Sequence, residues 1–158
     1  MNIEKLEDYT DWERVSSQSG LSEDFIRQYK DHVVWDCISK FQVLSESFIR
    51  EFQDKVWWKR ISCYQKLSES FIREFKDKVS WEHISQYQVL SEDFIEDFKN
   101  EVNWLFISKY QYLSNLERFK DKLLFPYIMT NKKISIDTIK ENIDLIYVNF
   151  KPHHDFIC

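Results

Sequence analysis

Three residues near the C-terminus have side chains that could do chemistry together. His153, His154 and Cys158 could offer two imidazoles and a thiolate, which are ligands that zinc prefers in proteins. Their spacing matches no standard closed zinc site, and a fourth ligand is missing. We therefore expect no metal site and no cofactor, and we expect a loose tail here.

Signatures of catalysis are missing elsewhere in the chain. The sequence holds a single glycine, Gly20, whereas nucleotide-binding loops need several glycines to bring backbone amides to phosphate. Neither a G-x-S-x-G elbow nor an H-E-x-x-H motif occurs. Glu51 and Glu74 are equivalent positions of a repeat, with no reason to act as a catalytic pair. We expect a protein that is not an enzyme.

Composition narrows the fold and the partners. Of 158 residues, 17% are aromatic and 31% are charged, which is typical of an ordered, amphipathic protein. One glycine and two prolines leave few residues for tight β-turns, so an all-β fold is unlikely. The net charge of −5 argues against nucleic acid as a partner.

The thiols and the apolar runs indicate the compartment. Cys37, Cys63 and Cys158 are an odd number with irregular spacing, which is typical of free thiols in a reducing environment. The N-terminus shows no secretory signal, and the longest apolar run, 123–129, is too short to cross a bilayer. We expect an intracellular protein that does not enter a membrane.

A repeat of 23 residues organises most of the chain. The segment LSESFIREFQDKV at 44–56 returns at 67–79 with one change, Gln53 to Lys76. Three columns recur at this spacing: Leu21, Leu44, Leu67, Leu90 and Leu113; Trp12, Trp35, Trp58, Trp81 and Trp104; Val15, Ile38, Ile61, Ile84 and Ile107. A fixed short period predicts an α-solenoid, in which each unit buries its apolar face against its neighbours.

Each repeat predicts two short helices. The first begins after an N-cap such as Ser22 and carries Phe25 and Ile26 on one face, with a solvated charged face such as Glu23–Arg27–Asp31 opposite. The second begins near a tryptophan, and its apolar stripe is predicted to run through Trp35, Ile38 and Phe41. Helices this short are marginal alone, so stacking must hold them.

Two polar columns run inside this pattern. Ser16, Ser39, Ser62, Ser85 and Ser108 follow the buried aliphatic residue of the second helix, where a small side chain would let helices approach closely. Gln42, Gln65, Gln88 and Gln111 precede the next first helix. They could form a ladder between repeats or lie at the surface.

The ends of the chain depart from the repeat, as caps do. Residues 1–11 lack the Leu-Ser-Glu element, although Ile3 and Leu6 could form an apolar lead-in. The unit after Leu113 is two residues shorter, and 136–150 predicts one longer amphipathic helix that covers the last repeat. We expect one structural domain, with about five helix–turn–helix repeats in 1–125 and a capping helix and tail in 126–158. A closed helical bundle is the alternative.

A variable column beside the constant framework is the candidate binding surface. The two residues after each tryptophan change freely: Glu13 and Arg14, Asp36 and Cys37, Lys59 and Arg60, Glu82 and His83, Leu105 and Phe106. Lys40, Cys63, Gln86 and Lys109 follow one turn on. Solenoids use extended surfaces of this kind for recognition. Tolerance of any residue by solvent would explain the variation equally well.

The repeat Trp-x-x-Ile-Ser-x-Tyr-Gln-x-Leu-Ser-Glu-x-Phe-Ile resembles tandem repeats in proteins of giant DNA viruses that infect amoebae. It is carried by 58–79 and 81–102, and more loosely by 35–56. The resemblance implies an α-helical repeat protein without catalytic residues, located in the host cytoplasm, a viral factory or the virion.

We therefore expect a non-enzymatic scaffold that binds a host or viral protein. The alternative is a structural virion component that assembles with itself as a homo-oligomer. A nucleic-acid reader is a third hypothesis, because Arg27, Arg50 and Arg73 form a basic column, but Glu23, Glu46 and Glu69 neutralise it.

Overall fold

A computed structural model describes residues 11–149, and all regular structure in this range is helical. The chain divides into two compact units, 1–80 and 81–158, which are described one at a time. The predicted all-α, solenoid-like repeat of short helix pairs is confirmed. The predicted division at residue 125 stays a prediction, and Ile3, Leu6 and the tail from Phe150 lie outside the described range.

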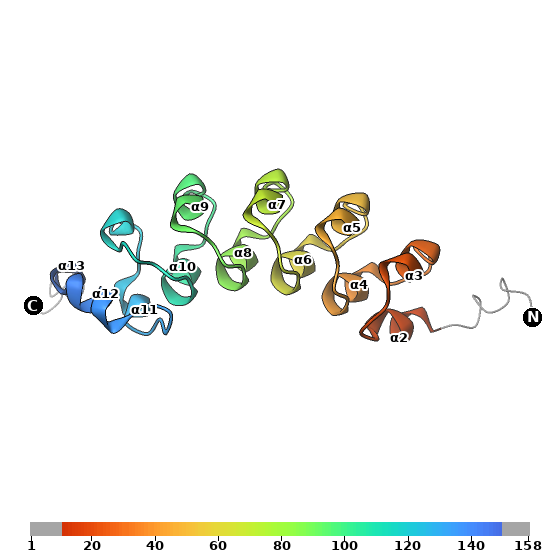
Figure 1. Ribbon diagram of the computed structural model, residues 1–158, viewed down its shortest axis with the longest axis horizontal. Coiled ribbons are helices and arrows are strands. Elements are labelled where there is room, and N and C mark those ends of the chain that lie inside the picture. The colour runs from red at the N-terminus through yellow and green to blue at the C-terminus, as the bar shows by residue number, and fades with distance from the viewer. Residues whose placement is uncertain (1–10, 150–158) are drawn as a thin grey trace, which may run out of the picture. The chain divides into compact units, whose positions relative to one another are not determined.

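Helices recur in register with the tryptophans. The first unit contains α2 (Trp12–Ser17), α3 (Glu23–Gln28), α4 (Trp35–Phe41), α5 (Glu46–Glu51), α6 (Trp58–Tyr64) and α7 (Glu69–Glu74). The second contains α8 (Trp81–Tyr87), α9 (Glu92–Asp97), α10 (Trp104–Tyr110), the 3₁₀ helix η1 (Glu117–Phe119), α11 (Phe125–Ile128), α12 (Ile136–Glu141) and α13 (Ile143–Asn149). Within the first unit α4 packs between α2 and α6, and within the second α10 packs between α8 and α11 (Figure 1).

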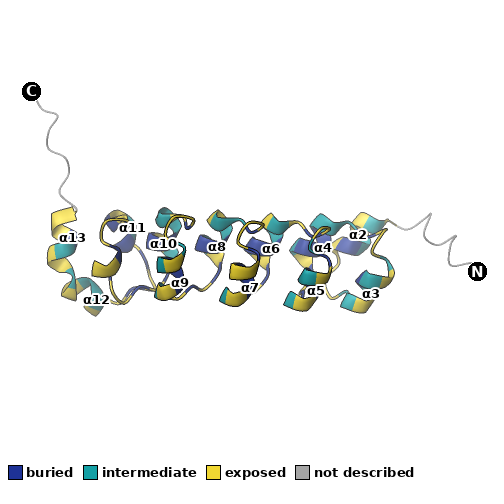
Figure 2. Ribbon diagram, turned by 90° about the horizontal axis from the view of Figure 1, so that it is seen from above, coloured by how far each residue is buried: buried dark blue, intermediate teal, exposed yellow. Residues whose placement is uncertain are grey.

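The first helices begin where the sequence predicts. The hydroxyls of Ser22, Ser45, Ser68 and Ser91 each accept a hydrogen bond from the backbone N–H three residues on, at 3.1–3.2 Å. The apolar pair that follows is inaccessible to solvent, as at Phe48 and Ile49. These helices therefore combine a local cap with a buried face (Figure 2).

Each tryptophan joins its helix to the one that follows. The indole N–H of Trp58 donates to the carbonyl oxygen of Gln53 at 2.9 Å, and its ring lies against Phe71 and Phe75 at centroid distances of 6.2 and 4.9 Å. Trp35 repeats this arrangement with Phe48 and Phe52. The polar edge of the indole is thereby satisfied while its ring is packed.

The buried serines do more than let helices approach. Ser39 donates its hydroxyl to the Trp35 carbonyl at 2.7 Å and accepts the backbone N–H of Trp57, in the next repeat, at 3.0 Å. Equivalent bonds join Ser16 to Val34, Ser62 to Ser80, Ser85 to Asn103, and Ser108 to Leu124, each at 2.9 Å. The expectation of a merely small residue is corrected, since each hydroxyl satisfies the first N–H group before a helix.

The glutamines form the ladder that was one of the two predicted alternatives. Gln65 donates its amide to the carbonyls of Ser39 and Gln42 at 3.0 and 2.8 Å, and its side-chain oxygen accepts the N–H of Leu44 at 3.0 Å. Its side chain is 5% exposed. Gln111 makes the same bonds to the repeat that precedes it. Gln42 bonds the Leu21 N–H and the carbonyls of Ser16 and Gln18, the latter one residue before the equivalent position.

The charged face is exposed, as predicted, and its side chains also link neighbouring repeats. Glu23 accepts the backbone N–H of Ser45 at 2.7 Å. The guanidinium of Arg27 donates to Glu51 at 2.8 Å, and Arg50 donates to Glu74 at 2.9 Å. These pairs remain largely exposed, so solvent screens them and each adds little to stability.

The predicted single helix over 136–150 is wrong, because the chain turns at Asn142. Its backbone angles, φ −110° and ψ 19°, nearly match those of Phe98 at the end of α9, φ −112° and ψ 29°. Ser135 caps α12 through the Thr138 N–H at 3.0 Å, as Ser91 caps α9. The segment therefore begins as a further repeat, with Ile-Ser in place of Leu-Ser.

Asn131 continues the ladder into this last part. Its side-chain amide donates to the carbonyls of Ser108 and Gln111 at 2.9 and 2.8 Å, as the amides of Gln65 and Gln111 donate to a serine and a glutamine carbonyl of the repeat before.

Replacing Gln65 with leucine should destabilise the fold by about 2–5 kcal/mol, because the carbonyls of Ser39 and Gln42 and the N–H of Leu44 would be buried without partners. Urea denaturation followed by circular dichroism measures this. Gln28→Leu, the same change at an exposed site, should cost less than about 0.5 kcal/mol. Equal urea midpoints for the two variants would contradict the ladder.

Replacing Ser39 with alanine separates the two explanations of the serine column. Alanine is small enough for any close helix contact, so a purely steric role predicts no loss of stability. The observed bonds predict a loss of about 1–3 kcal/mol, since the N–H of Trp57 would lose its acceptor. Thermal unfolding beside the exposed control Ser47→Ala decides between them.

Candidate functional site

The predicted variable column lies on the first turn of the second helices. In the first unit Glu13, Arg14 and Lys59 are exposed. In the second unit Glu82 is exposed, and His83, Leu105 and Phe106 are half-buried. Cys37 is buried, with 9% of its surface accessible, and is removed from the set because a partner could not reach it.

Asp36 and Arg60 are occupied with each other. The Arg60 guanidinium donates to the Asp36 carboxylate at 3.0 Å, and this hydrogen bond raises the pKa of Arg60 above its ordinary value. The pair joins α4 to α6 and is about one-third exposed on each side. Lys59 is thus the exposed cation beside this pair.

Aromatic side chains on the last turn of the same helices form a second exposed column, which the sequence pattern did not predict. Phe41 is 41% exposed, and the equivalent Tyr64 and Tyr87 are 50% and 52% exposed. Six residues after Trp35, a side chain lies about 120° around the helix from that tryptophan, at the edge of the apolar stripe. The prediction that Phe41 belongs to the buried stripe is therefore wrong.

The aromatic column contacts the variable column within each unit. The Lys40 ammonium lies 4.6 Å from the ring centroid of Phe41 and 5.9 Å from that of Tyr64. His83 stacks on Tyr87, and Phe106 stacks on Tyr110, both with centroids 6.0 Å apart. Each of these two stacks joins a residue of the variable column to a ring one turn further along the same helix.

We call these residues, taken within each unit separately, the second-helix face. It consists of Glu13, Arg14, Asp36, Lys40, Phe41, Lys59, Arg60 and Tyr64 in the first unit, and of Glu82, His83, Tyr87, Leu105, Phe106, Lys109 and Tyr110 in the second. The loops after it add exposed apolar side chains, among them Val43 at 93%, Val89 at 84% and Tyr112 at 58%. Such a strip can stack on rings, engage cations with aromatic faces and bury aliphatic groups.

Two arginines of the column that was considered for nucleic-acid binding already form ion pairs with glutamates of this chain. Arg27 contacts Glu23 and Glu51, and Arg50 contacts Glu46 and Glu74. Each of these guanidinium groups also lies over a phenylalanine ring of the next repeat, at 5.0 and 4.9 Å. These contacts give both arginines a role in joining repeats.

Two kinds of site are not found in the part of the chain that the structure describes. Among residues 11–149, no three His, Cys, Asp or Glu side chains are grouped to hold a metal ion. The three tail residues considered as zinc ligands lie beyond this range. No helix between Asp11 and Asn149 is both long and apolar enough to span a membrane.

Comparisons with protein-family models, with curated proteins and with solved structures gave no match to this chain.

Proposed function

We propose that the protein is a non-enzymatic scaffold that binds a protein partner on its second-helix face. The observation that carries this proposal is the exposure of an aromatic ring at the same position of successive repeats, Phe41 and Tyr64 in the first unit and Tyr87 in the second. The fold does not need these rings, because the buried face is made by other columns. Exposed apolar groups gathered in this way mark interaction surfaces.

The chemistry of the strip favours a protein with apolar and acidic side chains. Tyrosine and arginine are enriched among the residues that dominate binding energy, and Lys40 and Lys59 supply cations beside the rings of the first unit. The side chain next to each ring differs between repeats, so selectivity can be set one repeat at a time.

The repeat resemblance to giant-virus proteins supports a more specific form of this proposal. In that form the protein is viral, acts inside an infected cell and binds a host or viral partner. A salt-sensitive gel shift with single-stranded or double-stranded nucleic acid would favour the third hypothesis instead.

The double variant Tyr64→Ser and Lys59→Glu should lose its partner without losing its fold. The ring and the cation both lie on the face and outside the core, so circular dichroism and thermal unfolding should be unchanged. Affinity capture with quantitative mass spectrometry should show at least about a tenfold drop for the specific partner.

The matched control is Lys30→Glu, which makes the same charge change on an exposed residue just after α3. It should retain the partner. Equal capture by the double variant and the control would contradict a role for the second-helix face.

Self-association is a second candidate function, favoured by the C-terminal helices. Ile136, Ile143, Tyr147 and Val148 are 51–71% exposed on α12 and α13. Ile143 and Tyr147 also line an apolar hollow of about 190 Å³ with Met129 and Ile146. Large apolar side chains exposed together in this way are available to contact another copy.

Light scattering after size-exclusion chromatography tests this candidate. Self-association predicts a molar mass that rises with protein concentration and returns to the monomer value in Tyr147→Ser with Val148→Ser. A monomer mass at every concentration would exclude it.

A further inference from the structure

The repeat loses an aromatic residue where it becomes two residues shorter. Counting back from Phe119, which stands where Phe98 stands one repeat earlier, Leu116 takes the place of Ile95 and Asn115 takes the place of Phe94. Leu116 is buried, but Asn115 is exposed and uses its side chain to accept the Arg118 N–H at 3.1 Å. The first helix of this repeat is reduced to the 3₁₀ turn η1.

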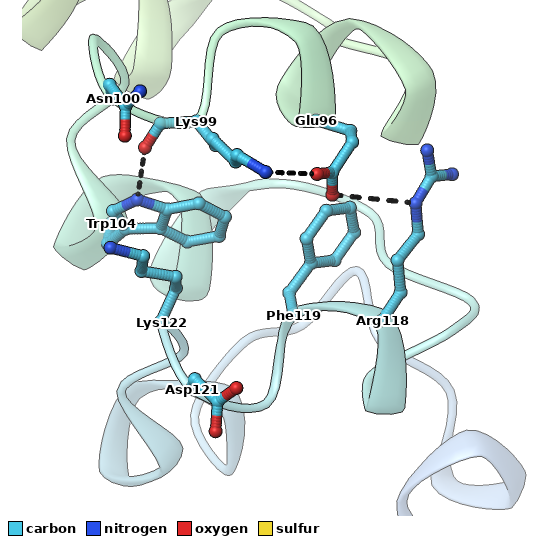
Figure 3. Close-up of a pocket in the computed structure, with 8 residues that line it drawn as sticks. All are labelled: Glu96, Lys99, Asn100, Trp104, Arg118, Phe119, Asp121 and Lys122. Atoms are coloured by element: carbon cyan, nitrogen blue, oxygen red, sulfur yellow. Dashed lines mark hydrogen bonds and ion pairs between the residues drawn. The ribbon is translucent and has the colours of Figure 1, made fainter.

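Trp104 consequently packs differently from the other tryptophans. Trp35 and Trp58 each have two phenylalanine rings of the following helix within 6.3 Å. Trp104 lies against Phe119 at 5.7 Å, and the counterpart of the second ring is Asn115. A pocket of about 250 Å³ opens between Trp104, Phe119 and the end of α9 (Figure 3). About 150 Å³ suffices to hold a benzene ring.

The lysine at the edge of this pocket has lost the partner that its counterparts keep. Lys55 pairs with Asp31 at 2.8 Å, and Lys78 pairs with Asp54 at 3.2 Å. At the equivalent places stand Lys122 and Asn100, both of which line the pocket. The structure, which covers residues 11–149, shows no ion pair for Lys122.

Glu96, Lys99 and Arg118, which also line the pocket, form ion pairs. Glu96 contacts Lys99 at 2.9 Å and Arg118 at 3.8 Å, and Arg118 also contacts Asp93 at 2.8 Å (Figure 3). Asp121 lines the rim, and in Figure 3 its carboxylate points away from Trp104. An incoming anion would therefore meet Lys122 and the Asn100 amide.

We propose that this pocket binds a peptide segment in which an aromatic side chain lies next to a carboxylate, such as Phe-Asp. The ring takes the place of the missing phenylalanine against Trp104 and Phe119. The carboxylate takes the place of the missing aspartate and pairs with Lys122. The aromatic ring and the carboxylate of the ligand thus match the phenylalanine and the aspartate that other repeats of this chain have at these places. The site is separate from the second-helix face, and the test below does not involve that face.

The dipeptide N-acetyl-Phe-Asp-amide is the direct probe. Titration into ¹⁵N-labelled full-length protein should shift the indole N–H signal of Trp104, assigned with Trp104→Phe, with a dissociation constant of about 1–10 mM. N-acetyl-Ala-Asp-amide and N-acetyl-Phe-Asn-amide should each bind at least about fivefold more weakly. No shift of this signal with the first peptide, or equal binding of the three, would overturn the proposal.

Two variants test the carboxylate half with a control from the same chain. Lys122→Gln removes the cation, and Asn100→Asp restores the acidic partner that Lys55 and Lys78 have, so both should weaken the Phe-Asp peptide about fivefold or more. Lys55→Gln, at the paired position of the first unit, should leave binding unchanged. Unchanged spectra away from the pocket verify folding. Undiminished binding by both Lys122→Gln and Asn100→Asp would overturn the assigned role of Lys122.

Discussion

Buried glutamine amides that reach from one repeat into the next are the interaction on which the structure depends. The helices have only six or seven residues in most repeats, which is too short to be stable alone in water. The last turns of the helices and the segments between them leave carbonyl and N–H groups that no helix satisfies. Gln65 supplies donors and an acceptor to three such groups of the preceding repeat. Burying the aromatic faces is possible because this backbone is satisfied at the same time.

Much of this architecture is readable from the sequence because it depends on period and on local caps. The 23-residue spacing, the serine caps and the start of helices at tryptophans follow from patterns within one repeat. The roles of Ser39 and Gln65 do not, because a polar residue in a repeat column can face solvent or a neighbour equally well. Only the packing of one repeat on another decides between these. The turn at Asn142 was missed for a related reason, since isoleucines at helical spacing obscured the Ile-Ser element that begins a further repeat.

The candidate sites differ in how visible they are in the sequence. The variable column was predictable from comparison between repeats, but its pairing of Asp36 with Arg60 needed two helices placed side by side. Phe41 was assigned to the core because spacing by three continues an apolar stripe for only a short distance around a helix. The reading frame of the shortened repeat, with Phe119 in the place of Phe98, is readable from the sequence, but the pocket beside Trp104 appears only in the packing.

Where framework residues differ between repeats, the ion pairs that they form are kept. Where residues of the second-helix face differ between repeats, no such pairing is kept. The pairs Arg27–Glu51 and Arg50–Glu74 become Glu96–Arg118 in the second unit, with the charges exchanged and the attraction kept. No comparable exchange relates Lys59, Glu82 and Leu105, which occupy one position of successive repeats. This contrast separates residues that join repeats from residues that are available to a partner.

Native-state hydrogen exchange at the Leu44 amide tests the dependence on glutamine most directly. Leu44 lies in a connecting segment outside any helix, and its N–H donates to the Gln65 side chain. If the amide ladder holds neighbouring repeats together, this N–H exchanges as slowly as that of Ile49 within α5, through opening of the packed repeats. Exchange of the Leu44 N–H at the rate of an exposed loop amide, with Ile49 still protected, would contradict the account.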